Sequence, residues 1–295
     1  MTSYSKVMKK HGKTFFWATA FLEKKTADKL YAVYAFCRHI DDLIDENQAD
    51  DNSYKDFYSI KNAWDKNKFT GAFDELKNID EDFMPREDII REFLKGQMSD
   101  ITYNQPKDMN ELLVYCYQVA GAVGLMVCDV IGIKDPRLKY FAIDLGIAMQ
   151  LTNICRDINE DAAINRIYLP KDMINLSLDS FRNPTKNDIK KINLIRNNLL
   201  SVANKYYESG DKGIAHLPSK TARAVFVASR LYQHIGIKTL NTNTSYESQR
   251  VYLNKFEKLK ITLKLLFKVN NKKAIESHNE VLHLSLVELP DAHIK

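Results

Sequence analysis

The chain has few residues of the kinds that interrupt helices. Among its 295 residues only 10 are glycine and 7 are proline, so long stretches can remain helical. Runs of alternating apolar residues closed by Asn-Gly or Asp-Gly turns are missing, which argues against a fold built from β-hairpins. Apolar residues recur instead at helical spacing, as in Ile143, Ile147 and Ile154. We therefore predict an all-α fold.

Cysteine is also scarce, with four residues and no Cys-x-x-Cys pair. The cysteines lie among apolar residues, so we expect reduced thiols in the core of a cytoplasmic protein. The apolar stretch after Lys13 is barely long enough for a signal sequence and runs directly into charged residues, so we reject a signal peptide. No segment approaches the roughly 20 apolar residues that a membrane span requires.

The hydrophobic content of 45% suffices for a substantial core, and the 27% of charged residues suits a soluble protein. The polar segments between the expected helices are short, and none resembles an interdomain linker. We therefore predict one domain over residues 1–295, with a basic amphipathic segment at 250–273 and a loosely held polar tail at 274–295.

The net charge of +5 is concentrated in residues 250–273, which hold eight basic residues and one acidic residue. Phe256, Leu259 and Leu263 recur there at helical spacing. The segment is either a helix that contacts anionic lipid or a diphosphate, or a final bundle helix with a basic solvent-facing side. The pattern favours the second interpretation. Nucleic-acid binding is not expected, because interleaved aromatic and basic residues and a matching fold signature are both missing.

Two acidic motifs are the main candidates for a functional site. Asp41 and Asp45 are four residues apart, as are Asp157 and Asp161, so each pair would lie on one helix face. About two such spacings are expected by chance at this composition, so the spacing alone carries no weight. If the pairs faced each other they would repel unless cations lay between them. Mg²⁺ is the natural candidate, because it binds one or two carboxylates together with substrate phosphate.

The residues around the first pair support this hypothesis. Tyr34 and Arg38 precede Asp41 and Asp45 at helical spacing, so all four would line one face. The guanidinium and the phenol can reach phosphate or carboxylate oxygens. Asp42 is rotated by about 100° from Asp41. The alternative is a surface ladder of Arg–Asp pairs, which would need no substrate.

The second pair ends a polar stripe on an otherwise apolar helix. The stripe consists of Gly146, Gln150, Asn153, Asp157 and Asp161. A helix that is apolar nearly all round is buried, so its polar stripe must face a cavity or another polar surface. We favour a ligand cavity, with Arg156 and Arg166 placed to hold phosphate. Small residues at Ala120, Gly121 and Gly124 serve either tight helix packing or space for a hydrocarbon chain.

Several segments together resemble the squalene and phytoene synthase family. Its two signature stretches are matched by Tyr115–Gly124 and Leu145–Pro170, and its first aspartate-rich motif by Asp41–Asp45 after Tyr34–Arg38. His11–Phe15 resembles an N-terminal family element, with Gly12 in place of a serine. Gly96–Asp100 resembles a segment of the phytoene synthase branch. The resemblance runs in order from about residue 11 to residue 250.

The resemblance implies an isoprenoid synthase-type helical bundle around a central cavity. It also implies head-to-head condensation of two allylic prenyl diphosphates through a cyclopropyl diphosphate. The implied catalytic and Mg²⁺-binding residues, for which Mn²⁺ could substitute, are Asp41, Asp45, Asp157 and Asp161. The implied substrate-binding residues are Lys13, Tyr34, Arg38, Gln150, Asn153, Arg156 and Arg166.

Within this family the sequence favours phytoene synthesis from two geranylgeranyl diphosphates in carotenoid biosynthesis, with no nicotinamide cofactor. The alternative is a C15-using enzyme that makes dehydrosqualene, presqualene diphosphate or squalene. An inactive helical partner subunit is an alternative of another class, against which the two intact aspartate pairs argue. A di-iron bundle would need two Glu-x-x-His pairs, and the chain offers only Glu280-x-x-His283.

Overall fold

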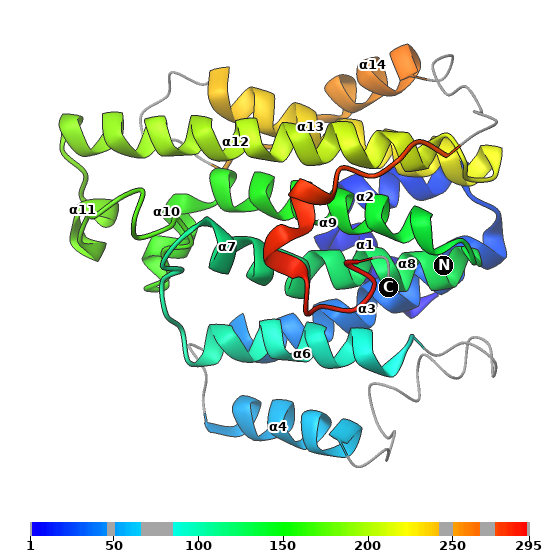
Figure 1. Cartoon of the computed structure of the whole chain (residues 1–295), viewed down its shortest axis with the longest axis horizontal. Helices are drawn as coiled ribbons and strands as arrows, with labels where there is room; N and C mark the ends of the chain where they lie inside the picture. Colours follow the sequence, from blue (N-terminus) through cyan, green and yellow to red (C-terminus); the bar gives the residue numbers. More distant parts are fainter. Residues whose placement is uncertain (1, 46–50, 66–84, 242–249, 266–274, 294–295) are drawn as a thin grey trace.

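The computed structural model describes residues 2–45, 51–65, 85–241, 250–265 and 275–293 (Figure 1). Every regular element in these ranges is a helix, so the predicted all-α fold is confirmed. The remainder of the predicted basic segment (266–273) and of the predicted tail (274 and 294–295) lies outside the described residues, as does the side chain of Asp45.

The elements are, in chain order, α1 (Ser3–His11), α2 (Lys13–Ala18), η1 (Thr19–Phe21), α3 (Lys24–Asp45), α4 (Asp51–Asp65), α6 (Glu87–Ile101), α7 (Met109–Cys116), η2 (Tyr117–Gly121), α8 (Ala122–Ile131), α9 (Pro136–Arg156), α10 (Ile158–Ala163), α11 (Leu178–Arg182), α12 (Lys186–Ile214), α13 (Ser219–Asn241), α14 (Lys255–Leu265) and η3 (Glu280–Leu286).

Helix α9 is the central element of the bundle. It begins where the Asp135 side chain accepts a hydrogen bond from the Arg137 backbone and Pro136 occupies the first turn. It packs against α12, α13, η2 and α8, and in Figure 1 it lies between the α12–α13 pair and α6. Most of its residues are buried, as expected of a helix that is apolar on nearly every side.

Glycines let α9 approach the preceding helices closely. A Cβ at Gly124 would lie 2.4 Å from the carbonyl oxygen of Ala142, and a Cβ at Gly146 would lie 2.4 Å from that of Ala120. The small residues therefore serve tight helix packing, which settles the alternative left open by the sequence. The assignment of Gly146 to a cavity-facing stripe is wrong, because its Cα faces the backbone of η2.

The helical run Met109–Ile131 contains a π-helical turn, η2, and is apolar over most of its length. With a mean hydropathy of 1.6 over its most apolar window, it is long and apolar enough to cross a membrane by length and composition. The expectation that no segment approaches such a span is thus wrong by those two criteria. The run packs against α9 and α6, and a core position explains its composition equally well.

The C-terminal segment 275–293 is firmly attached, so the prediction of a loosely held tail is wrong for these residues. The Tyr206 hydroxyl donates to the Leu282 carbonyl at 2.6 Å, and the Tyr117 hydroxyl donates to the Pro290 carbonyl at 2.5 Å. Leu286 is fully buried. Three polar residues of this segment, His278, His283 and Asp291, have partners in the bundle.

Among those partners is Asp144, a buried carboxylate on α9. Its Oδ1 lies 2.8 Å from Nε2 of His283, and its Oδ2 lies 2.8 Å from Nε2 of His278. Nδ1 of His283 donates to the carbonyl of Ala292 at 2.9 Å. Figure 1 shows this C-terminal segment lying across the middle of the bundle.

Candidate active site

The first acidic group lies at the C-terminal end of α3. Nη1 of Arg38 donates to Oδ2 of Asp41 at 3.0 Å, and Nη2 of Arg38 pairs with Asp42. The Arg–Asp pairing that we considered as an alternative is therefore present. It includes Asp42, and the i,i+4 spacing between Arg38 and Asp42 could have predicted this pair from the sequence. Nε of Arg38 is buried without a hydrogen-bond partner among the described residues. A buried donor of this kind is suited to an anion.

The second acidic group lies at the junction of α9 and α10. Helix α9 ends at Arg156 and α10 begins at Ile158, so the predicted continuous helix is interrupted at Asp157. The amide of Asp157 nevertheless donates to the Asn153 carbonyl, and that of Asp161 to the Asp157 carbonyl, both at 2.8 Å. This helical bonding keeps Asp157 and Asp161 on one side of the chain, as predicted.

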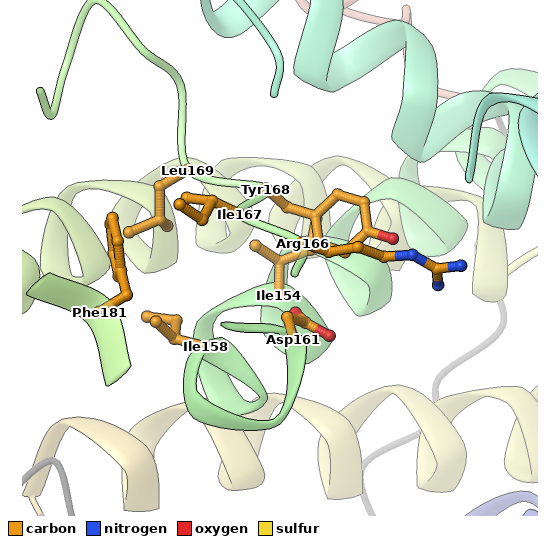
Figure 2. A pocket seen from close by; sticks show the side chains of 8 residues that line it. All are labelled: Ile154, Ile158, Asp161, Arg166, Ile167, Tyr168, Leu169 and Phe181. Carbon is orange, nitrogen blue, oxygen red and sulfur yellow. The ribbon is translucent and has the colours of Figure 1, made fainter. Parts of the chain in front are cut away.

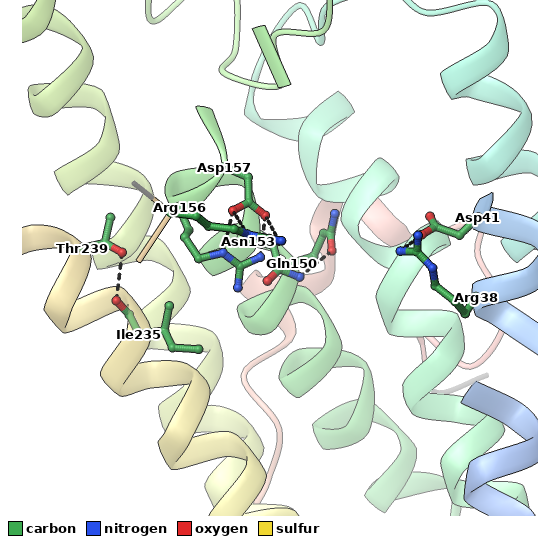
Figure 3. A network of polar contacts seen from close by, with 9 residues as sticks. Arg38, Asp41, Gln150, Asn153, Arg156, Asp157, Ile235 and Thr239 are labelled. Atoms are coloured by element: carbon green, nitrogen blue, oxygen red, sulfur yellow. Dashed lines mark hydrogen bonds and ion pairs between the residues drawn. The ribbon is translucent and has the colours of Figure 1, made fainter. Parts of the chain in front are cut away.

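Two arginines hold the Asp157 carboxylate (Figure 3). Arg156 donates from Nε to Oδ1 at 2.6 Å and from Nη2 to Oδ2 at 2.5 Å. Arg250 donates from its own Nε to Oδ1 at 2.9 Å and from Nη2 to Oδ2 at 2.8 Å. Burial alone would raise the pKa of Asp157, but the two guanidinium groups lower it. The carboxylate is therefore charged, and its charge is balanced by groups that also suit phosphate.

The pKa of Asp161 is shifted in the opposite direction from that of Asp157. Burial, and then the neighbouring charge of Asp157, raise the pKa of Asp161 to about 8. Asp161 and Arg166 adjoin a small pocket that is otherwise lined mainly by apolar side chains (Figure 2). The cavity volume of this pocket is about 10 Å³, room for about one water molecule, whereas ligand pockets are typically roughly 300–1,000 Å³. It is too small for a long prenyl chain, so the predicted central cavity stays a prediction.

Aromatic side chains connect the two acidic groups. The ring of Phe15 on α2 lies 6.3 Å from the ring of Tyr34 on α3 and 5.0 Å from that of Tyr232 on α13. Burial and then the nearby Tyr232 raise the pKa of Tyr34. Burial also raises the pKa of Tyr232, with Arg156 opposing it and Asp157 adding to it. Tyr34 is thus within electrostatic reach of Asp41, and Tyr232 is within reach of Asp157.

Gln150 and Asn153 lie between these groups in Figure 3, about two turns and about one turn, respectively, before the end of α9. Nδ2 of Asn153 donates to Oε1 of Gln150 at 3.3 Å. Oδ1 of Asn153 is buried and has no hydrogen-bond partner in the described part of the chain. A buried amide oxygen without a donor is costly, and a ligand or a bound cation would satisfy it.

Lys13 begins α2, and a second lysine that sequence reasoning missed lies near it. Burial, and then the charge of Lys13, lower the pKa of Lys258 on α14. Neither lysine has a carboxylate within ion-pair distance among the residues that the structure describes. Two neighbouring cations of this kind are suited to a polyanionic ligand.

Arg166 is held at the edge of the site by Asp100. Its Nη2 donates to the Asp100 backbone carbonyl at 3.3 Å. The Asp100 carboxylate in turn accepts from the hydroxyls of Tyr115 at 3.0 Å and Tyr168 at 2.7 Å. Asp100 was identified in the sequence only as part of a resembling segment. Its role in orienting Arg166 depends on long-range contacts with no local signal.

Gly12 lies directly against the Tyr34 ring. A Cβ at this position would be 2.7 Å from Cζ and 2.9 Å from the hydroxyl oxygen of Tyr34. A serine, which the resembling family element has here, would fit only if Tyr34 moved. The departure from the family pattern therefore has a packing reason in this chain.

Comparisons with known proteins identify the family of this chain. The family model of squalene/phytoene synthase matches residues 8–257. A phytoene synthase of Pseudescherichia vulneris is 30% identical over 269 residues, which cover 86% of this chain and 87% of that protein. A 15-cis-phytoene synthase of Synechococcus elongatus is 29% identical over 277 residues, covering 85% of this chain and 87% of its own.

Solved structures give the same result for the fold. A dehydrosqualene synthase crystallised with a ligand superposes with a TM-score of 0.76 at 26% identity, covering 89% of this chain and 93% of that one. A squalene synthase of Alicyclobacillus acidocaldarius superposes with a TM-score of 0.66 at 21% identity, covering 80% of this chain and 90% of its own. The predicted isoprenoid synthase-type bundle is confirmed, and the chain belongs to the squalene/phytoene synthase family.

Proposed function

We propose that this protein condenses two geranylgeranyl diphosphates head to head to form phytoene, in carotenoid biosynthesis. The observation that carries the proposal is the pairing of each acidic group with arginine forks, on the two sides of the Phe15 ring. The similarity of the chain to phytoene synthases supports geranylgeranyl diphosphate, the C20 substrate. The second candidate is C15 condensation, supported by the likeness to a dehydrosqualene synthase structure.

Asp157 and Asp161, together with Asp41 and Asp45, would hold Mg²⁺ or Mn²⁺. The site fits a divalent cation because burial, and then the charge of Asp157, raise the pKa of Asp161, and a bound cation would favour its charged form. Bound Mg²⁺ would act as a Lewis acid that stabilises negative charge on the departing diphosphate. Asp45 enters this proposal through its place in α3, one helical turn after Asp41.

The arginines and lysines would bind the diphosphate oxygens. Arg38, Arg156 and Arg250 donate to aspartates in the structure, and the same forks match phosphate geometry. Lys13 and Lys258 add positive charge from α2 and α14. Gln150, Asn153 and Arg166 complete the substrate-binding set, and the buried Asn153 Oδ1 has no hydrogen-bond partner among the described residues.

The reaction breaks the C1–O bond of one substrate and releases diphosphate, leaving an allylic cation. The double bond of the second chain attacks this cation, and loss of a proton gives a cyclopropyl diphosphate. Its own C–O bond then breaks, the carbon skeleton rearranges, and a second proton is lost to give a C40 triene. No reductant is consumed on this route, so a nicotinamide cofactor is not needed. Phe15, Tyr34 and Tyr232 would shield the cations from water.

Incubation of the purified protein with geranylgeranyl or farnesyl diphosphate tests the proposal, each with and without Mg²⁺ and NADPH. We expect a Mg²⁺-dependent C40 triene that forms without NADPH. A C30 product instead would favour the C15 alternative, and no product from either substrate would favour the inactive-partner alternative.

Asp157→Asn should abolish turnover while the thermal unfolding midpoint shows that the protein remains folded. Near-normal turnover of this variant would remove Asp157 from the metal site.

We include a cytoplasmic location with peripheral membrane contact in the proposal. Long prenyl chains and the C40 product partition into bilayers, because burying each CH₂ group is favourable by about 0.8 kcal/mol. An enzyme that handles them gains from access to the bilayer surface.

A further inference from the structure

The outer face of α14 and of the residues just before it is apolar. Phe256 is 84% exposed, Leu263 53% and Leu259 45%, and the preceding Tyr252 is 68% exposed. The face turned toward the bundle instead carries buried Lys258 and Thr262 together with Leu265. An ordinary surface helix buries its apolar stripe and exposes its polar one. Exposed lysines give α14 the predicted basic solvent-facing side, and large apolar side chains share that side with them.

Positive charge surrounds this apolar face. Lys255, Lys260 and Lys264 are exposed beside it. Glu257 is the acidic residue of α14, and it pairs with Lys238 of α13 at 2.7 Å. The described part of the helix thus offers apolar side chains and net positive charge together, which complements the surface of an anionic bilayer.

The same segment reaches the candidate active site from its inner side. Arg250, at the start of the segment, holds Asp157, and Lys258 lies near Lys13. The indole of Trp17 on α2 donates to the hydroxyl of Thr262 at 3.1 Å. Figure 1 shows α14 on the outside of the bundle, against α13. One short segment therefore links the diphosphate-binding groups to the outward apolar face.

We propose that the face formed by Tyr252, Phe256, Leu259 and Leu263 docks onto an anionic lipid bilayer. The aromatic and leucine side chains enter the interface while the flanking lysines contact lipid headgroups. Docking holds the diphosphate-binding side of the segment next to the membrane in which prenyl substrates and product dissolve. This reason for docking depends on the proposed function, whereas the surface itself is independent of it.

Vesicle flotation with the full-length protein tests the proposal, using phosphatidylcholine vesicles and phosphatidylcholine–phosphatidylglycerol vesicles. We expect the protein to float with the anionic vesicles and to release them at high salt. The double variant Phe256→Ser with Leu263→Ser should reduce the floated fraction at least about tenfold. The matched control Leu194→Ser removes a leucine of α12 that is 61% exposed, and it should float like the parent protein.

Equal flotation of the double variant and the parent, or no flotation of the parent with either vesicle, would overturn the proposal. A shift of the double variant to a smaller species in solution, without any vesicle binding by the parent, would instead identify the face as an interface between two copies. Assays with detergent-dispersed substrate separate docking from catalysis. The double variant should retain normal turnover there, whereas failure of the proposed function would abolish turnover of the parent while its flotation remained.

Discussion

Arg250 holds both carboxylate oxygens of Asp157, a residue 93 positions earlier in the chain, at 2.9 and 2.8 Å. Arg156 donates to the same two oxygens, but its side chain is largely buried whereas that of Arg250 is 58% exposed. Arg156 is therefore a fixed part of the site, and Arg250 is the partner that can move. On substrate binding, a cation would bind the Asp157 carboxylate, and the diphosphate beside it would bind the Arg250 guanidinium. The Arg250–Asp157 ion pair would then be replaced by these two contacts.

Replacement of Arg250 tests this relationship. We expect Arg250→Ala to lower kcat/KM by about 10- to 100-fold, because a charged two-pronged contact to phosphate is lost. The kcat/KM of Arg250→Lys should lie between those of the parent and Arg250→Ala, since lysine keeps the positive charge but cannot make the two-pronged guanidinium contact. Arg223→Ala removes an exposed arginine of α13 and serves as the control. Steady-state kinetics measure the effect, and unchanged kcat/KM in Arg250→Ala would exclude Arg250 from substrate binding.

Asp161 predicts a conflict between stability and function. Its folded pKa of about 8 exceeds the unfolded value of about 3.9, so the folded state loses stability as the pH rises from about 4 to about 8. Asp161→Asn removes the buried charge and should raise the unfolding midpoint of metal-free protein at a pH of about 8.5, while turnover is lost.

Thermal unfolding in EDTA at acidic and alkaline pH measures this difference. The gain should be smallest at the acidic end, where Asp161 is already neutral in the folded protein. A variant that is less stable than the parent at alkaline pH would contradict the assignment of a raised pKa.

Local periodicity was sufficient to predict the helical fold and which polar residues share a helix face. Arg38 with Asp41, and Asn153 with Asp157, lie where helical spacing places them. The junction at Asp157 was not predicted, because Asp-Ile-Asn-Glu-Asp contains no glycine or proline to mark it.

The contributions of Arg250 and Lys258 could not be predicted, because they depend on where α14 packs. The sequence of a basic helix does not show which of its lysines face solvent and which face the candidate active site. The prediction of a loosely held tail was wrong for a related reason. His278 and His283 are polar residue types, which suggested a solvent-exposed segment, but both contact the buried carboxylate of Asp144.

The contact of Gly124 with α9 predicts a steric effect. A methyl group there would lie 2.4 Å from the Ala142 carbonyl oxygen, which is backbone and cannot rotate away. Gly124→Ala should therefore destabilise the protein by about 1–3 kcal/mol, although alanine favours helix formation. Gly132→Ala is a useful comparison, since its Cβ would meet nothing within 4 Å but its φ of +75° strains any other residue. Denaturant unfolding would contradict the packing argument if Gly124→Ala were as stable as the parent.

The contact between Asp144 and His283 predicts how the C-terminal segment is held. Nδ1 of His283 donates to the Ala292 carbonyl, which can only accept, while Nε2 of the same ring lies 2.8 Å from the buried Asp144 carboxylate. Weakening the hydrogen bonds of a buried carboxylate costs about 1–3 kcal/mol. Asp144→Asn should therefore lower the unfolding free energy by that order and expose residues 275–293 to limited proteolysis.

The pH dependence of this pair has a defined sign. Burial would raise the pKa of Asp144, but hydrogen bonds from His278 and His283 lower it below its unfolded value. The stabilisation is thus present above a pH of about 4 and is lost as the pH falls through the folded pKa. The parent should lose more stability than Asp144→Asn between pH values of about 5 and 3. Urea unfolding at each pH measures this, with EDTA present in a parallel series. A midpoint that falls on adding EDTA at neutral pH in the parent but not in Asp144→Asn would show that a metal ion, rather than a proton, joins Asp144 to the imidazoles.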